Sequence, residues 1–143
     1  MITLALVTLA ATIAVPNYQT MIQNNHLNAQ TNLLVSTLNF ARSEAIKRNV
    51  AITLTANDTN IWHSGWLVAG LGNATIRSQA AFEGDTTLVA NASLNTITYR
   101  PTGFLQGNTS ASFSLCDSRT GETGRTIHVS TTGYINIHNL TCP

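Results

Sequence analysis

The chain has 143 residues and a net charge of +1, and only 9% of its residues are charged whereas 43% are hydrophobic. This length suits one domain with a sizeable core, and the hydrophobic fraction excludes intrinsic disorder. A net charge so close to zero argues against a nucleic-acid binder that works through bulk electrostatics.

The first predicted element is a long helix. Residues 1–15 carry no charged side chain and are followed by Pro16. This stretch is shorter than the roughly 20 residues that span a bilayer, but it is apolar all round, which suits lipid or a larger assembly. Helical periodicity resumes after the proline and predicts one helix of about 45 residues, kinked or locally melted at Pro16. The positions that carry this periodicity are Tyr18, Met21, Ile22, Leu27, Leu34, Leu38, Ala41 and Ala45.

The predicted helix ends in a cluster of charges. Glu44 precedes Lys47 and Arg48 by three and four residues, which is the spacing of helical ion pairs. The cations Arg42, Lys47 and Arg48 also lie near the negative end of the helix dipole.

After Asn49 the hydrophobic pattern changes from helical to alternating, which predicts strands. The expected strands cover residues 50–56, 65–69, 75–82, 86–89, 95–100, 110–116, 125–130 and 133–138. Turn residues separate them, and the clearest hairpin turns at Thr131, Thr132 and Gly133. The order of elements predicts an α+β fold, in which a long N-terminal helix is laid against an antiparallel sheet.

Several sequence blocks occur together along the chain. TIAVPNY ends the apolar segment, FARSEAIKRNVAITL begins at Phe40, and IWHSGWLV begins at Ile61. YRPTGF, CDSR and GRTIHVSTTG follow from Tyr99, Cys116 and Gly124. In this order the blocks resemble the GspH/FimT family of type IV pilin-like proteins, which includes type II secretion pseudopilins and FimU/FimT-like minor pilins. The resemblance implies a type IV pilin-like fold. It also implies a start truncated by a few residues and a leader peptide, so that the cleavage site and the helix glutamate of the family lie outside this chain.

The resemblance also implies a division of the chain. Residues 1–24 would be the apolar half of the helix, for the membrane or the filament core, and residues 25–143 a globular head that includes the second half of the helix. The expected membrane or core positions are Leu4, Leu6, Leu9, Ile13 and Pro16. The expected contacts between helix and head are Leu34, Leu38, Trp62 and Trp66, with sugar or base stacking as the alternative role for the tryptophans.

The chain has two cysteines, Cys116 and Cys142. In a protein of the cell envelope they would form one disulfide, whereas in the cytoplasm they would be two free buried thiols. The envelope location that the resemblance implies favours the disulfide, worth roughly 3–4 kcal/mol on the chain-entropy model. Such a C-terminal disulfide is common in FimU/FimT-like proteins and favours a pilus over a secretion system.

The sequence shows no pattern typical of an enzyme. It has no nucleophile elbow, no glycine-rich phosphate loop and no obvious carboxylate pair. Its four histidines, His26, His63, His128 and His138, do not have the spacing of metal ligands. We therefore predict a protein without catalytic residues, cofactor or metal.

The leading functional prediction is a structural minor pilin of a type IV pilus, which helps to prime assembly and lies in or near the tip complex. Its partners would be other pilins and minor pilins, bound through the helix and the head. The resemblance implies a single-pass location in the bacterial inner membrane with the head in the periplasm, followed by an extracellular pilus. A pseudopilin of type II secretion and a major filament subunit are alternatives.

A further alternative is a minor pilin that binds DNA in natural transformation. Some FimT-like proteins use a basic C-terminal motif for this purpose, but the matching position here has Tyr134 and Asn136 in place of its arginines. Arg119 and Arg125 remain as candidate DNA contacts, although Asp117 and Glu122 cancel their charge. Nucleic acid is therefore not the favoured partner.

Overall fold

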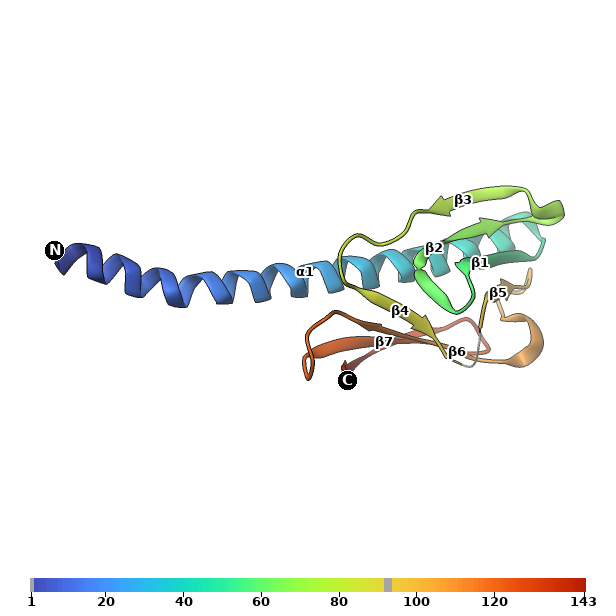
Figure 1. Ribbon diagram of the computed structural model, residues 1–143. Helices are drawn as coiled ribbons and strands as arrows, with labels where there is room; N and C mark the ends of the chain where they lie inside the picture. Colours follow the sequence, from blue (N-terminus) through green and yellow to red (C-terminus); the bar gives the residue numbers. More distant parts are fainter. Residues whose placement is uncertain (1, 92–93) are drawn as a thin grey trace.

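The computed structural model describes the backbone of residues 2–91 and 94–143, and within these ranges the side chains from residue 18 onward. Its first element is one helix, α1 (Ile2–Arg48), which projects from a β-sheet head at its N-terminal end (Figure 1). The helix continues through position 16, so the predicted local melting at Pro16 is wrong. A proline removes one bond of the helical ladder, and the bonds on both sides maintain the helix.

The second half of α1 is the part that packs on the sheet. Among the described side chains, the first buried one is Leu27, and the predicted apolar face is confirmed from there to Ala45. Its fully or almost fully buried members are Leu27, Leu34, Leu38, Ala41 and Ala45. By contrast, Tyr18, Met21 and Ile22 lie on the projecting part and are exposed. The helix therefore enters the head close to residue 27.

Two threonines share the buried face of α1. The hydroxyl groups of Thr31 and Thr37 donate hydrogen bonds of 2.7 and 2.9 Å to the carbonyl oxygens of Leu27 and Leu33, one turn earlier. Because these bonds satisfy the hydroxyl groups within the helix, the side chains are buried without another polar partner.

In the described residues eight strands follow α1, and the eight predicted strands are confirmed with shifted ends. They are β1 (Ile52–Asp58), β2 (Ile61–Ala69), β3 (Thr75–Gln79), β4 (Thr87–Ala90), β5 (Thr96–Tyr99), β6 (Ala111–Cys116), β7 (Thr123–Val129) and β8 (Ile135–Thr141). They form one antiparallel sheet in the order β5-β1-β2-β4-β6-β7-β8, with β3 paired to β2. Short 3-10 turns lie at Leu71–Asn73 and Gln106–Asn108.

The largest difference from the predicted strands is the early start of β2. The register between β1 and β2 shifts between Ala56 and Asp58, and Gly65 in β2 has a φ of 95°. This bulge bends β2, so that its first residue Ile61 pairs with Val89 of β4 while its later residues pair with β3. The bulge interrupts the alternating pattern, which explains why the sequence located only the second half of the strand.

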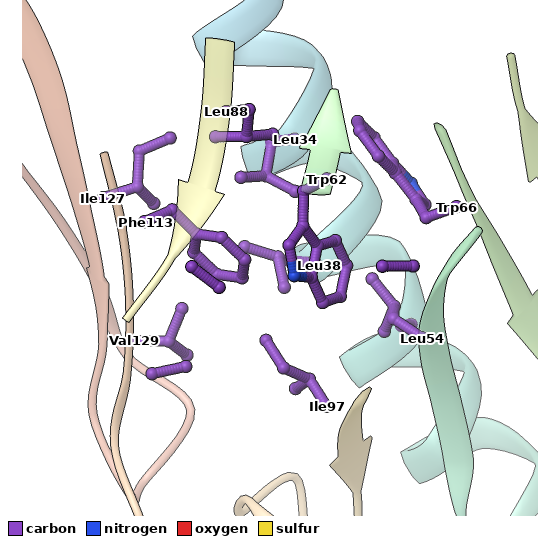
Figure 2. Packing of buried hydrophobic residues seen from close by; sticks show 14 of the residues in the cluster. Leu34, Leu38, Leu54, Trp62, Trp66, Leu88, Ile97, Phe113, Ile127 and Val129 are labelled. Carbon is purple, nitrogen blue, oxygen red and sulfur yellow. The ribbon is translucent and has the colours of Figure 1, made fainter. Parts of the chain in front are cut away.

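The core lies between the sheet and the second half of α1. Trp62 and Phe113 meet edge to face with 5.0 Å between ring centroids, and Trp62 and Trp66 are 6.3 Å apart. Figure 2 shows Leu34 and Leu38 beside this aromatic cluster. All these side chains are fully buried, so the cluster fixes the sheet against the helix.

Candidate functional site

Arg42 connects α1 to two loops of the head. Its Nε and Nη2 atoms donate hydrogen bonds, each of 3.1 Å, to the carbonyl oxygens of Gly103 and Thr132. Gly103 follows β5, and Thr132 lies in the turn between β7 and β8. We call this arrangement of Arg42 and the two carbonyl groups the arginine clamp. The sequence placed Arg42 among the cations at the helix end and did not predict this contact.

The arginine clamp depends on a glycine at position 133. Gly133 has a φ of 77°, a left-handed conformation that side chains disfavour. A Cβ atom there would collide with the carbonyl oxygen of Gly103 and lie 3.0 Å from Nε of Arg42. The blocks FARSEA, YRPTGF and GRTIHVSTTG each contribute one part of the clamp, and this convergence was the available signal in the sequence.

Tyr99 lies directly under the arginine clamp. Its ring is fully buried, and its hydroxyl group has no hydrogen-bond partner among the residues that the structure describes. Burial raises the pKa of Tyr99 to about 12, although the nearby charge of Arg42 acts in the opposite direction. The residue therefore remains neutral in the folded protein at physiological pH.

Three large apolar side chains are exposed around the arginine clamp. Phe104 and Tyr134 follow Gly103 and Gly133 in the chain, and Ile46 has its Cδ1 atom 3.0 Å from the position of a Cβ on Gly103. Each of the three exposes about half of its surface or more. Apolar groups gathered in this way are typical of a contact surface.

The predicted disulfide between Cys116 and Cys142 is confirmed, with 5.8 Å between the two Cα atoms. It joins the end of β6 to the residue that follows β8, across the intervening strand β7. Gly124 of β7 lies under the bridge, and a Cβ atom there would meet the sulfur atoms of both cysteines. The disulfide therefore fixes the C-terminal end of the chain to the sheet.

Arg119 and Arg125, the candidate DNA contacts, both bind the helix. Arg119 donates a hydrogen bond of 2.9 Å to Asn24 and forms an ion pair of 2.6 Å with Asp117. Arg125 donates a hydrogen bond of 3.2 Å to Asn28. These contacts hold β7 and the loop before it beside α1, so neither guanidinium group is a freely exposed cation.

The pKa of Asp117 reflects its pairing with Arg119. Burial on its own would raise this pKa, but hydrogen bonds from the side chain and backbone of Arg119, together with its charge, hold the pKa below its usual range. The same hydrogen bond raises the pKa of Arg119. Both groups therefore stay charged over the physiological range.

An open pocket of about 250 Å³ lies where α1 enters the head. Gln23 and His26 line it from the helix, and Glu83, Asp85 and Asp117 line it from two loops. Among the residues that the structure describes, no three histidine, cysteine, aspartate or glutamate side chains come together as metal ligands.

The other predicted positions fall into two groups. Leu34, Leu38, Trp62 and Trp66 lie in the buried core between helix and sheet. The side chains of Leu4, Leu6, Leu9, Ile13 and Pro16 lie outside the described residues. The ion pair predicted at the helix end is confirmed between Glu44 and Arg48, with 2.6 Å between the charged atoms.

The sequence of the chain matches a known protein family. The sequence model of the family described as type II transport protein GspH matches residues 30–133, which cover the buried half of α1 and most of the sheet. The chain belongs to the GspH family. Its long helix and antiparallel sheet form a type IV pilin-like fold.

Solved structures show the same fold. A crystal structure of the type IV minor pilin FimU from Pseudomonas aeruginosa PAO1 has a TM-score of 0.74 at 24% identity, over 81% of this chain and 90% of that chain. A second crystal form of the same minor pilin gives a TM-score of 0.70 at 23% identity, over 78% and 91% of the two chains. Among curated proteins, no significant match was found. At these identities the likeness establishes the fold.

Proposed function

We propose that this member of the GspH family is a structural minor pilin of a type IV pilus, which helps to prime assembly and lies in or near the tip complex. The observation that carries the proposal is the shape of the chain. One half of α1 is packed into the head, whereas the other half projects from it (Figure 1). A projecting helix of this kind provides a surface for the helices of neighbouring subunits.

The proposal assigns different roles to the two parts of the chain. Residues 1–24 would pack in the filament core through Leu4, Leu6, Leu9 and Ile13, and residues 25–143 would form the head. Before assembly the apolar half would lie in the bacterial inner membrane, with the head in the periplasm. In the part of the chain that the structure describes, no helix is both long and apolar enough to cross a membrane.

The contacts of the head favour a structural role over DNA binding. Non-specific DNA binding needs cations that reach phosphate groups. Arg119 and Arg125 instead contact Asn24 and Asn28 of α1, and Arg42 and Arg100 donate hydrogen bonds to loop carbonyl groups. A pseudopilin of type II secretion has the same fold, and the C-terminal disulfide favours the pilus.

Genetic complementation in the bacterium of origin tests the proposal. We expect deletion of the gene to reduce the number of pili without reducing protein secretion, and the full chain to restore them. A variant with Leu6→Arg and Leu9→Arg would not restore them, because charged side chains do not fit an apolar filament core. Asn25→Arg is the matched control, since it adds the same side chain at an exposed helix position beyond the apolar segment.

Two results would contradict the proposal. Loss of secretion with normal piliation would identify a pseudopilin instead. Loss of DNA uptake with normal piliation would favour the DNA-binding alternative, and salt-dependent binding of DNA by the full chain, weakened by Arg125→Ala, would support that alternative directly.

A further inference from the structure

The outer edge of β8 is open. The strand is the last one in the sheet order, and no other described strand pairs with its outer side. Its sequence, INIHNLT, contains no acidic residue, lysine, arginine or proline, and none of its side chains is buried. Natural proteins usually protect such edges with charges, prolines or covering segments. A long uncharged edge without this protection is a site to which another strand can be added.

Hydrogen bonds at the ends of β8 show which backbone groups face outward. Cys142 and Tyr134 bond to backbone groups of Glu122 and Ser130 on the β7 side. Because the direction of these groups alternates along an antiparallel pair, positions 136, 138 and 140 also face β7. The N–H and C=O groups of Ile135, Ile137, Asn139 and Thr141 therefore point away from the sheet.

The apolar face of the sheet continues to this edge. Ile137 lies directly opposite Ile127 of β7, so their side chains share one face. Ile127 is fully buried under α1, whereas Ile137 exposes 45% of its surface. A further strand with an apolar side chain opposite Ile137 would extend the core by one cross-strand pair.

Both ends of β8 are fixed by contacts described above. The arginine clamp holds the turn before the strand at Thr132, and the disulfide holds Cys142 directly after it. A partner strand would therefore meet a strand that is already ordered, and little conformational entropy would be lost on the side of β8.

The direction of β8 defines the kind of strand that can pair with it. β8 begins beside Arg42, near the C-terminal end of α1. It runs back toward Asn28, since Arg125 of β7, which pairs with Asn139 of β8, contacts Asn28. An antiparallel partner strand runs the opposite way, along α1. If the helices of neighbouring subunits lie parallel in a filament, the partner must present an edge strand that runs along its own helix.

With the helices parallel, a second copy of this chain does not present a matching strand. Among the described edge strands, β5 runs along α1, but it has only four residues and its Tyr99 is bridged to Leu105. β3 runs in the opposite direction (Figure 1). To pair along all seven residues of β8, the partner strand must be longer than β5 and must therefore come from a different subunit.

We propose that the outer edge of β8 pairs antiparallel with an extended, uncharged edge strand of a different pilin-family subunit in the same filament. The apolar side chains of that strand would alternate so that one lies opposite Ile137. This inference rests on the proposed function and specifies the surface through which the head meets its neighbour.

Hydrogen exchange of the full chain in detergent micelles tests the pairing. Each pilin-family subunit of the same bacterium is purified as a full chain and added singly. We expect one of them to slow exchange at the amides of Ile135, Ile137, Asn139 and Thr141 by about tenfold or more, since these donors gain partners.

Two variants and a control separate edge pairing from other contacts. Asn139→Pro removes one outward N–H group without removing a bond to β7, and Ile137→Lys places a charge at the edge. Each should weaken binding of that subunit by about tenfold or more. Leu67→Lys changes a position of similar exposure in β2 that is paired on both sides, and it should leave binding unchanged. Thermal unfolding of each variant verifies that it is folded.

The outcomes distinguish this inference from the function on which it rests. Association with a pilin-family subunit that leaves the four amides unprotected would overturn the inference but agree with the proposed function. Protection by a second copy of this chain would overturn the choice of partner. Association with none of the subunits would contradict both.

Discussion

Nη2 of Arg42 donates a hydrogen bond of 3.1 Å to the carbonyl oxygen of Thr132, which lies 90 residues further along the chain. Through Nε the same side chain also binds the carbonyl oxygen of Gly103. A single guanidinium group thus ties the helix to loops from two parts of the sheet. The fork geometry of arginine allows both bonds to form at once.

Arg42→Lys should lower the free energy of unfolding by about 2 kcal/mol, because one ammonium group cannot satisfy both carbonyl groups in this geometry. Urea unfolding of the full chain in detergent, followed by near-ultraviolet circular dichroism, measures the effect. Arg48→Lys is the matched control. It alters an exposed ion pair with Glu44 and should change stability by less than about 0.5 kcal/mol. Equal effects of the two substitutions would contradict the role of the arginine clamp.

Gly133→Ala should destabilise the head more than Gly121→Ala. Both glycines have a φ of 77°, so both substitutions carry the cost of a left-handed alanine, about 1–2 kcal/mol. Only at Gly133 does the added Cβ meet the carbonyl oxygen of Gly103, whereas no atom of the described residues lies within 4 Å of a Cβ at Gly121. The difference between the two losses in unfolding free energy measures the cost of placing a Cβ atom where the two loops approach each other. Equal values would show that the loops can separate freely.

Removal of the disulfide by Cys116→Ser and Cys142→Ser should lower the free energy of unfolding by about 3 kcal/mol, because the unfolded chain loses a constraint on its C-terminal segment. The amides of β8 should also exchange faster, since the strand is then held only by β7 and by the arginine clamp. Urea unfolding and hydrogen exchange measure the two effects. Unchanged exchange in β8 would show that the disulfide does not hold this strand.

Tyr99→Phe should increase stability by about 1 kcal/mol at neutral pH, because it removes a buried hydroxyl group that finds no partner within the described part of the chain. It should also remove a pH dependence. The pKa of Tyr99 is about 12 in the folded protein and about 10 in the unfolded chain. The contribution of this pKa difference to the free energy of unfolding is therefore complete below pH 10 and is lost as the pH rises toward 12.

Unfolding measured between pH 10 and pH 12 should therefore show a decline of about 2–3 kcal/mol that is absent in the variant. The exposed Tyr134 provides the control, because Tyr134→Phe should keep the decline. A decline of equal size in Tyr99→Phe would assign the pH dependence to other groups.

Hydrophobic periodicity was sufficient to predict α1 and the eight strands, because apolar residues recur with a helical period in the one and alternate in the others. It could not locate the first half of β2, where the bulge at Gly65 interrupts the alternation. It also missed the arginine clamp, since the acceptors are backbone carbonyl groups that any residue carries. The sequence left Arg119 and Arg125 as candidate DNA contacts, and it could not reveal their partners Asn24 and Asn28, which are 95 and 97 residues away.

The backbone conformation explains the positions of several asparagine residues, which the sequence alone did not. Asparagine is one of the residues that tolerate positive φ, and Asn49, Asn60, Asn73 and Asn108 adopt it. They lie at the end of α1, in the turn between β1 and β2, and in the two 3-10 turns. Part of the asparagine content therefore forms the turns that connect the predicted elements.

The arginine clamp joins residues that are far apart in the sequence, and this separation affects how the chain can fold. Arg42 and Asn28 find their partners only after residues 125–132 have been synthesised, so the helix cannot dock on a complete sheet while the ribosome is still producing the last third of the chain. Contacts this distant in sequence slow folding and delay it until most of the chain is available. Until then only the strands already synthesised can cover the apolar face of α1, and apolar surface that is exposed in this way makes an incomplete chain prone to aggregation.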